Sequence, residues 1–175
     1  MSVIANTTVL SNWAAIGEVD VLRKLFARIY VTTEVYEEVR AGFDEGYAFY
    51  ESVVQAVAGI KGGTWIEITS VIGPAELRLF SEAPARLHCG ETSCIAVAKE
   101  RGWLFLSDDA DARKHAQRLG VTTSGTLGCL VLAVERRLAP LETANAWLQE
   151  MRRHGYRSPV AALQEILRDQ ARPAP

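Results

Sequence analysis

The residues of this chain best suited to chemistry are acids that stand at the ends of apolar runs. They are Glu38, Glu91, Asp108, Asp109 and Asp111. Three of them follow the apolar run 103–106, and another opens a helical segment. Carboxylates that a fold collects into one pocket repel one another, so they usually need a cation. The spacing therefore predicts a Mg²⁺ or Mn²⁺ site at one edge of an α/β sheet.

The composition is that of an ordinary globular chain. Hydrophobic residues make up 49% of the 175 residues, which is enough for a substantial core. We expect a single domain over residues 1–170, including C-terminal helices, and a disordered tail over 171–175. The formal net charge of −2 leaves no global basic footprint, which weighs against tight nonspecific binding to duplex nucleic acid.

The three cysteines form no CxxC pair, and with three histidines they give no zinc-ligand spacing. An odd number of cysteines without a signal-peptide pattern favours a reducing, cytoplasmic location. No apolar run reaches about 18 residues, so we expect no membrane span.

Short apolar runs alternate with helical patterns along the chain. The expected strands are residues 3–5, 29–31, 65–68 as an edge strand, 103–106 as a central strand, and 121–123. The expected helices are residues 9–16, 19–26, 33–42 capped by Thr33, 47–60, 91–101, 109–119, 125–137, 141–151 and 159–167, with 73–84 a helix or loop. This alternation predicts a three-layer α/β fold with a parallel sheet.

The carboxyl ends of parallel strands meet at one edge of a sheet, where ligands bind. Asn6 follows the first strand and Asp108 follows the strand at 103–106, so both should lie at that edge. Glu38 and Glu91 lie on helices and could lean over it. A hard divalent ion held there could activate water for phosphodiester hydrolysis.

Each of these residues also has an ordinary structural interpretation. Asp109 and Asp111 would suit the positive N-terminus of a helix, and Asp108 could be its N-cap. Glu91 would complement a helix dipole in the same way, and Asn6 could form a turn. The ordered set is more specific than any one member.

Four segments in order resemble the PIN-domain family, and most closely its VapC-like, Asn-Thr-Ser-start branch of bacterial and archaeal proteins. They are residues 6–10, 35–39, 90–96 and 106–113. The resemblance covers about residues 2–138 and is most specific between 88 and 128. It implies a three-layer α/β/α fold with a mostly parallel sheet. It also implies metal-dependent cleavage of RNA, often as the toxin of a toxin–antitoxin pair.

Carried over by position, the resemblance implies a metal site formed by Asn6, Glu38, Glu91, Asp108, Asp109 and, through water, Asp111. It implies catalytic roles for Glu38, Glu91, Asp108 and Asp109. Which of the two neighbouring aspartates holds the ion stays open at this point. Asn6 replaces the first Asp of most PIN nucleases. An amide brings no charge and should weaken binding of the ion.

Three polar residues near the acids are candidates for contacting substrate. Arg113 could touch a phosphate backbone, although pairing with Asp109 or Asp111 is slightly favoured. Thr8 could support a ligand or cap a helix, and Thr126 could face the pocket or begin a helix.

Two functions follow as hypotheses. The first is a Mg²⁺- or Mn²⁺-dependent endoribonuclease that acts on RNA and has an antitoxin protein as partner. The second is a catalytically weak PIN-like module that binds RNA or a protein, and Asn6 favours it. The apolar stretch 42–63 would serve as a homodimer face or an antitoxin groove, whereas packing on the domain's own core is the simpler account. Other phosphohydrolases are disfavoured because no Asp-x-Asp follows the first strand.

Overall fold

A parallel five-stranded sheet forms the centre of the protein in the computed structural model, which describes residues 1–60 and 62–170. The strands are β1 (Val3–Ala5), β2 (Ile29–Thr32), β3 (Ile66–Thr69), β4 (Leu104–Leu106) and β5 (Thr123–Ser124). Their order is β3-β2-β1-β4-β5, and every neighbouring pair is parallel. The parallel α/β fold expected from the sequence is confirmed.

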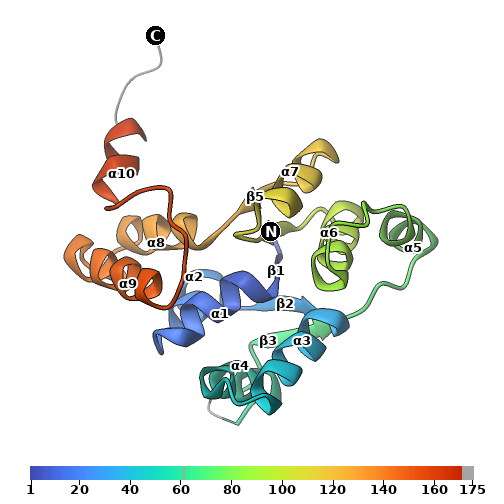
Figure 1. The fold of residues 1–175 in the computed structure, drawn as a ribbon, viewed down its shortest axis with the longest axis horizontal. Coiled ribbons are helices and arrows are strands. Elements are labelled where there is room, and N and C mark those ends of the chain that lie inside the picture. The colour runs from blue at the N-terminus through green and yellow to red at the C-terminus, as the bar shows by residue number, and fades with distance from the viewer. Residues whose placement is uncertain (61, 171–175) are drawn as a thin grey trace.

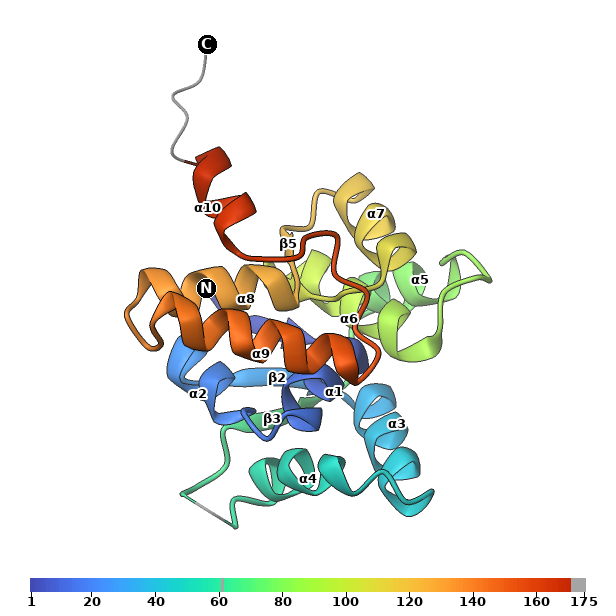
Figure 2. The ribbon, with the colours of Figure 1, turned by 60° about the vertical axis from the view of Figure 1, so that its left-hand side comes forward.

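Helices cover both faces of this sheet (Figure 1). On one side α1 (Thr7–Ala15), α2 (Asp20–Phe26), α8 (Thr126–Glu135) and α9 (Leu141–Arg153) pack together. On the other side α6 (Cys89–Arg101) contacts α3 (Thr33–Asp44), α5 (Pro74–Ser81) and α7 (Ala110–Arg118). The turned view shows α4 (Glu51–Ala58) below β3 and α10 (Gln164–Gln170) beyond α8 (Figure 2). The arrangement is a three-layer α/β/α fold.

The central strands β1 and β4 are buried on both faces. All three residues of β1 are buried, as are Phe105 and Leu106 of β4. Continuous apolar runs of this kind are typical of central parallel strands. The register pairs Ala5 with Leu106 and Leu106 with Ser124. The residues that follow these three strands therefore emerge side by side at one edge.

Most expected elements are confirmed, and the differences have local causes. Thr32, and not Thr33, caps α3, because its hydroxyl accepts a hydrogen bond from the backbone N–H of Val35 at 3.3 Å. The stretch 47–60 divides into a 3₁₀ turn (Ala48–Tyr50) followed by α4. The helix expected over 159–167 begins only at Gln164, and the tail expected over 171–175 lies outside the described residues.

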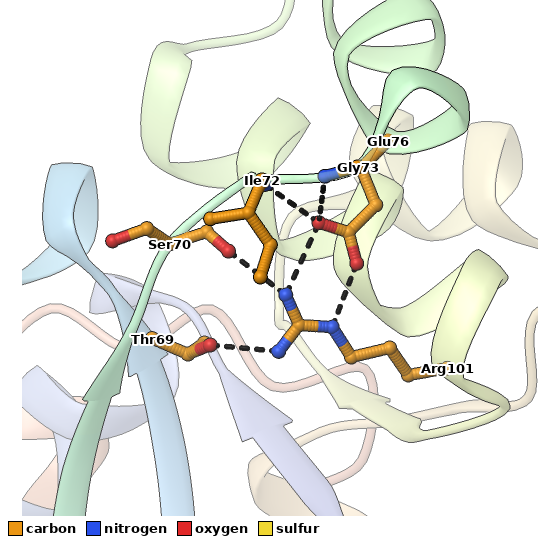
Figure 3. Close-up of polar contacts among 6 residues, drawn as sticks. All are labelled: Thr69, Ser70, Ile72, Gly73, Glu76 and Arg101. Carbon is orange, nitrogen blue, oxygen red and sulfur yellow. Dashed lines mark hydrogen bonds and ion pairs between the residues drawn. The ribbon is translucent and has the colours of Figure 1, made fainter.

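An ion pair between the partly buried Arg101 and the buried Glu76 holds the C-terminal end of α6 in place (Figure 3). The Arg101 guanidinium donates to both carboxylate oxygens of Glu76, at 2.6 and 3.1 Å, and to the Thr69 hydroxyl at 2.8 Å. Glu76 also accepts a hydrogen bond from the backbone N–H of Ile72 at 2.9 Å. Hydrogen bonding to Arg101 lowers the pKa of Glu76. This network ties α5, α6 and the end of β3 together, and α6 carries Glu91 at its other end.

Among the helices of residues 1–60 and 62–170, none combines the length and the apolar character that crossing a membrane requires.

Candidate functional site

A chain of hydrogen bonds joins the ends of β1 and β4 at the carboxyl edge of the sheet. The Asn6 amide donates to the Ser107 hydroxyl at 2.9 Å, and the Asn6 oxygen accepts from the Thr8 hydroxyl at 2.7 Å. The Thr8 hydroxyl in turn accepts from the backbone N–H of Asp108 at 3.0 Å. Asn6 is buried. The loop after β1 is therefore fixed to the loop after β4, as the sheet-edge argument required.

Asp108 lies on the β5 side of this edge, and hydrogen bonds engage both oxygens of its carboxylate. One oxygen accepts from the backbone N–H of Thr126 at 2.8 Å. The other accepts from the Asn12 amide at 2.9 Å and from the Thr126 hydroxyl. Gly125 makes this approach feasible, because a Cβ there would lie 2.6 Å from the Asp108 carboxylate. Asp108 therefore links α1 to the start of α8.

Asp109 is the N-cap of α7, a role that the sequence had suggested for Asp108. Its Oδ1 accepts a hydrogen bond from the backbone N–H of Ala112 at 2.7 Å. Its negative charge contributes to raising the pKa of Glu91, so the two carboxylates lie within electrostatic reach of each other. Of the two neighbouring aspartates, Asp109 is therefore the one coupled to the acid on α6.

Glu91 lies in the first turn of α6 and is buried. One of its oxygens accepts from the backbone N–H of His88 at 3.1 Å, so it closes the start of its own helix. Burial raises the pKa of Glu91, and the charges of Asp109 and Glu38 raise it further. Three acids from α3, α6 and the start of α7 thus share one electrostatic environment.

Glu38 reaches the site from the middle of α3. It accepts hydrogen bonds from the Thr7 hydroxyl and, at 3.3 Å, from the backbone N–H of Gly90. A Cβ at position 90 would lie 2.6 Å from the Glu38 carboxylate, so glycine is what lets this carboxylate touch α6. Glu38 is consequently held between the N-terminus of α1 and the N-terminus of α6.

The donor chemistry of these acids suits a hard divalent ion, which takes oxygen ligands. A bound cation would relieve the repulsion that the Asp109 and Glu38 carboxylates exert on Glu91. The side chains as they stand do not close around a common point, because no group of three His, Cys, Asp or Glu in the described part of the chain could hold an ion. An ion there would therefore require rearrangement of side chains or several water ligands, which Mg²⁺ usually keeps.

Two further candidates from the sequence lie near this edge, Asp111 and Arg113. Asp111 points to Arg86, with 3.5 Å between the carboxylate and the guanidinium, and belongs to the exposed surface. The favoured pairing of Arg113 with Asp109 or Asp111 is wrong for the residues described here, where the buried Arg113 Nε has no hydrogen-bond partner. Thr8 and Thr126 both bond to Asp108, as given above, so they support the site from within the protein.

Several residues at this edge escaped the sequence analysis. Thr7 and Ser107 adjoin the motif residues and could have been found as polar neighbours of strand ends. Asn12 stands four residues after Thr8 on α1, and this helical spacing was a usable signal. Tyr156 comes from the segment after α9, where no motif marks it; burial and the charge of Asp108 raise its pKa.

Three cavities adjoin one another along this edge. The first, of about 480 Å³, is lined by Glu38 and by residues of α1, α3 and the 3₁₀ turn. The second, of about 270 Å³, shares Ser11 and Asn12 with the first and reaches Asp108 and Asp109. The third, of about 340 Å³, shares Asp108, Tyr156 and Arg157 with the second and is also lined by Arg113. Together the cavities reach Glu38, Asp108 and Asp109.

Comparison with known proteins agrees with the motifs. A family model described as PIN domain matches residues 2–172. No curated protein sequence matches the chain significantly.

Proposed function

The chain belongs to the PIN-domain family, whose members are generally nucleases, and from this premise we propose that it is a metal-dependent endoribonuclease. The observation that carries the proposal is the coupling of Glu38, Glu91 and Asp109. Burial and the charges of Asp109 and Glu38 raise the pKa of Glu91, and Glu38 also accepts a hydrogen bond from the backbone N–H of Gly90 beside it, at the edge where α/β proteins bind ligands. A perturbed pKa of this kind is typical of functional sites.

In this proposal Glu38, Glu91 and Asp109 hold Mg²⁺ or Mn²⁺, with Asn6 as a neutral oxygen donor. When bound, such an ion would polarise a phosphate oxygen and lower the pKa of water. Thr7 orients Glu38, and the bond from the His88 N–H orients Glu91. Asp108 acts as a positioning residue, because its carboxylate is already engaged by Thr126 and Asn12. We propose no ligand role for Asp111.

The phosphate backbone of the RNA would meet Arg113. Its guanidinium lines the cavity next to Asp108, and its Nε has no protein partner among the described residues. Arg157 lines the same cavity and is exposed. Two arginines in one cavity beside an acidic centre would neutralise phosphates of the RNA strand on that side of the scissile bond.

We further propose that this nuclease is the toxin of a toxin–antitoxin pair. The Asn-Thr-Ser-type start and the Asp-Asp motif support that placement, and the partner would be an antitoxin protein. Three free cysteines, of which Cys94 and Cys129 are buried, support a reducing cytoplasmic location. A core that includes residues from β1 to Leu167 supports one domain over residues 1–170.

The second candidate is a PIN-like module that binds RNA or a protein and cleaves weakly. Two observations favour it: Asn6 supplies no charge, and no three carboxyl groups of the described chain stand close enough to share an ion. Under this account the acids would be remnants of a site.

The test is cleavage of a mixed single-stranded and structured RNA with Mn²⁺, with Mg²⁺ and with EDTA. The proposal expects cleavage that needs the ion and disappears in Asp109→Asn. Asp111→Asn is the matched control, since it removes the same charge two residues away and should cleave normally. Failure of folded wild-type protein to cleave with either ion would favour the binding module.

A further inference from the structure

The first cavity has the composition of a nucleobase pocket. It lies between α1, α3 and the 3₁₀ turn, and its lining includes Tyr47, Phe49 and Tyr50. The ring centroids of Tyr47 and Phe49 are 5.9 Å apart, and those of Phe49 and Tyr50 are 4.6 Å apart. The three rings thus form one continuous aromatic wall. Its volume of about 480 Å³ falls in the roughly 300–1,000 Å³ range of small-ligand sites.

One ring of this wall belongs to the core, and another is exposed to solvent. Tyr50 is buried, and a Cβ at position 42 would lie 2.6 Å from its ring, so only Gly42 lets the ring lie against α3. Tyr47, in contrast, is 54% exposed. Packing on the domain's own core therefore explains Tyr50 and leaves Tyr47 without a structural role. An exposed ring at the mouth of a cavity is the arrangement that stacks on an unpaired base.

The cavity adjoins the acids. Glu38 lines it, and Ser11 and Asn12 line both this cavity and the one that contains Asp108 and Asp109. A base lodged against the wall would consequently belong to a nucleotide adjacent to the scissile phosphate. No comparable aromatic wall lines the cavities on the Arg113 side in the part of the chain that is described.

The polar groups that line the cavity include two carboxylates beside Asn12, His154 and the tyrosine hydroxyls, and the Asn12 amide already donates to Asp108 and Thr126. Glu38 and Glu45 contribute carboxylates, and Ser11 contributes a hydroxyl. Guanine presents two adjacent N–H donors on its Watson–Crick edge, a pair that a carboxylate accepts in bidentate fashion. Glu45 is the C-cap of α3, is exposed and lines the cavity, and it lies outside the proposed ion site.

We infer that this aromatic pocket binds an unpaired guanine next to the cleaved bond, with Tyr47 stacking on the base and Glu45 accepting from its edge. The inference rests on the proposed ribonuclease function for its substrate. It adds base specificity, which neither the motifs nor the family match assigns.

The experiment measures binding in EDTA, so that it does not depend on cleavage. Fluorescence anisotropy compares a short labelled oligouridylate with the same oligomer carrying one central guanine. The wild-type protein should prefer the guanine oligomer about tenfold. Tyr47→Ala should weaken its binding about tenfold, and Tyr47→Phe should preserve it because the ring remains.

Glu45→Gln should abolish the preference for guanine. Its matched control is Glu37→Gln, which removes the same charge from an exposed position of α3 outside the cavity. Both variants reduce repulsion of RNA equally, so only a change in the ratio between the two oligomers reports recognition of the base.

Equal binding of both oligomers by wild type, or wild-type affinity in Tyr47→Ala, would overturn the inference even if metal-dependent cleavage is found. Guanine-selective binding without cleavage would keep the inference and refute only the nuclease activity. If Tyr47→Ala changed the oligomeric state in light scattering and left RNA binding unchanged, the pocket would be a protein-docking surface and the inference would be wrong.

Discussion

Replacing Asp108 should mainly lower the stability of the protein, whereas replacing Asp109 should mainly abolish RNA cleavage. Asp108 accepts hydrogen bonds at both oxygens, from the Thr126 backbone and side chain and from Asn12. In Asp108→Asn the new amide nitrogen would face donors, and the charge that strengthens these bonds would be lost. Hydrogen bonds to a charged group contribute about 1.5–3 kcal/mol each, and the Thr126 hydroxyl can reverse its direction. We therefore expect a loss of about 2–4 kcal/mol in the free energy of unfolding.

Asp109→Asn should behave differently because asparagine is as good an N-cap as aspartate. Losing the charge near the N-terminus of α7 costs about 0.3–1 kcal/mol. Relief of the repulsion with Glu91 acts in the opposite direction. The net change in the free energy of unfolding should stay within about 1 kcal/mol, whereas RNA cleavage should be lost.

The assay is urea unfolding in EDTA, followed by tryptophan fluorescence, together with RNA cleavage of the same preparations. EDTA removes any stabilisation that a bound ion would add to the wild type. Equal stability of Asp108→Asn and wild type would refute the anchoring role of Asp108. A stability loss in Asp109→Asn as large as in Asp108→Asn would refute the division of roles between the two residues.

Three further predictions concern neighbouring parts of the fold. Glu76→Gln should lower the free energy of unfolding by about 3 kcal/mol at neutral pH, because Arg101 loses a buried partner. Since the pKa of Glu76 is lowered in the folded protein, denaturation at several pH values should show this difference shrinking below about pH 4.3. Glu91→Gln should lose cleavage and be at least as stable as wild type at pH 7, because the raised pKa of Glu91 means that its charge destabilises the fold. Any stability gain, measured by urea unfolding, should fade as the pH falls toward about 4.3, and a clear loss at pH 7 would contradict the reasoning. Gly90→Ala should displace the Glu38 carboxylate and reduce cleavage by about 10–100-fold while circular dichroism stays unchanged; wild-type cleavage would contradict the placement of Glu38.

The sequence was sufficient for the sheet and for the meeting of its strand ends. Residues 3–5 and 103–106 carry the continuous apolar pattern of central strands, and this pattern placed Asn6 and Asp108 at one edge. The helix of Glu91 followed from apolar spacing and from the stop at Gly102, which adopts a left-handed conformation. These features are local, so local patterns reveal them.

Features that depend on distant contacts could not be predicted. Which of Asp108 and Asp109 faces Glu91 depends on bonds to Asn12 and Thr126, which are remote in sequence. The ion pair between Asp111 and Arg86 likewise joins segments that are distant in sequence. The cap at Thr32 instead of its neighbour reflects a one-residue uncertainty that only the backbone geometry resolves.

The central claim is that Glu38, Glu91 and Asp109 share one divalent ion. Titration with Mn²⁺ followed by electron paramagnetic resonance tests it most directly, because free and bound ions give different signals. The account predicts one saturable Mn²⁺ site in the wild-type protein, strongly weakened in Asp109→Asn and retained in Asp111→Asn. Folded wild-type protein that binds no Mn²⁺, or binds it equally well in both variants, would contradict the claim.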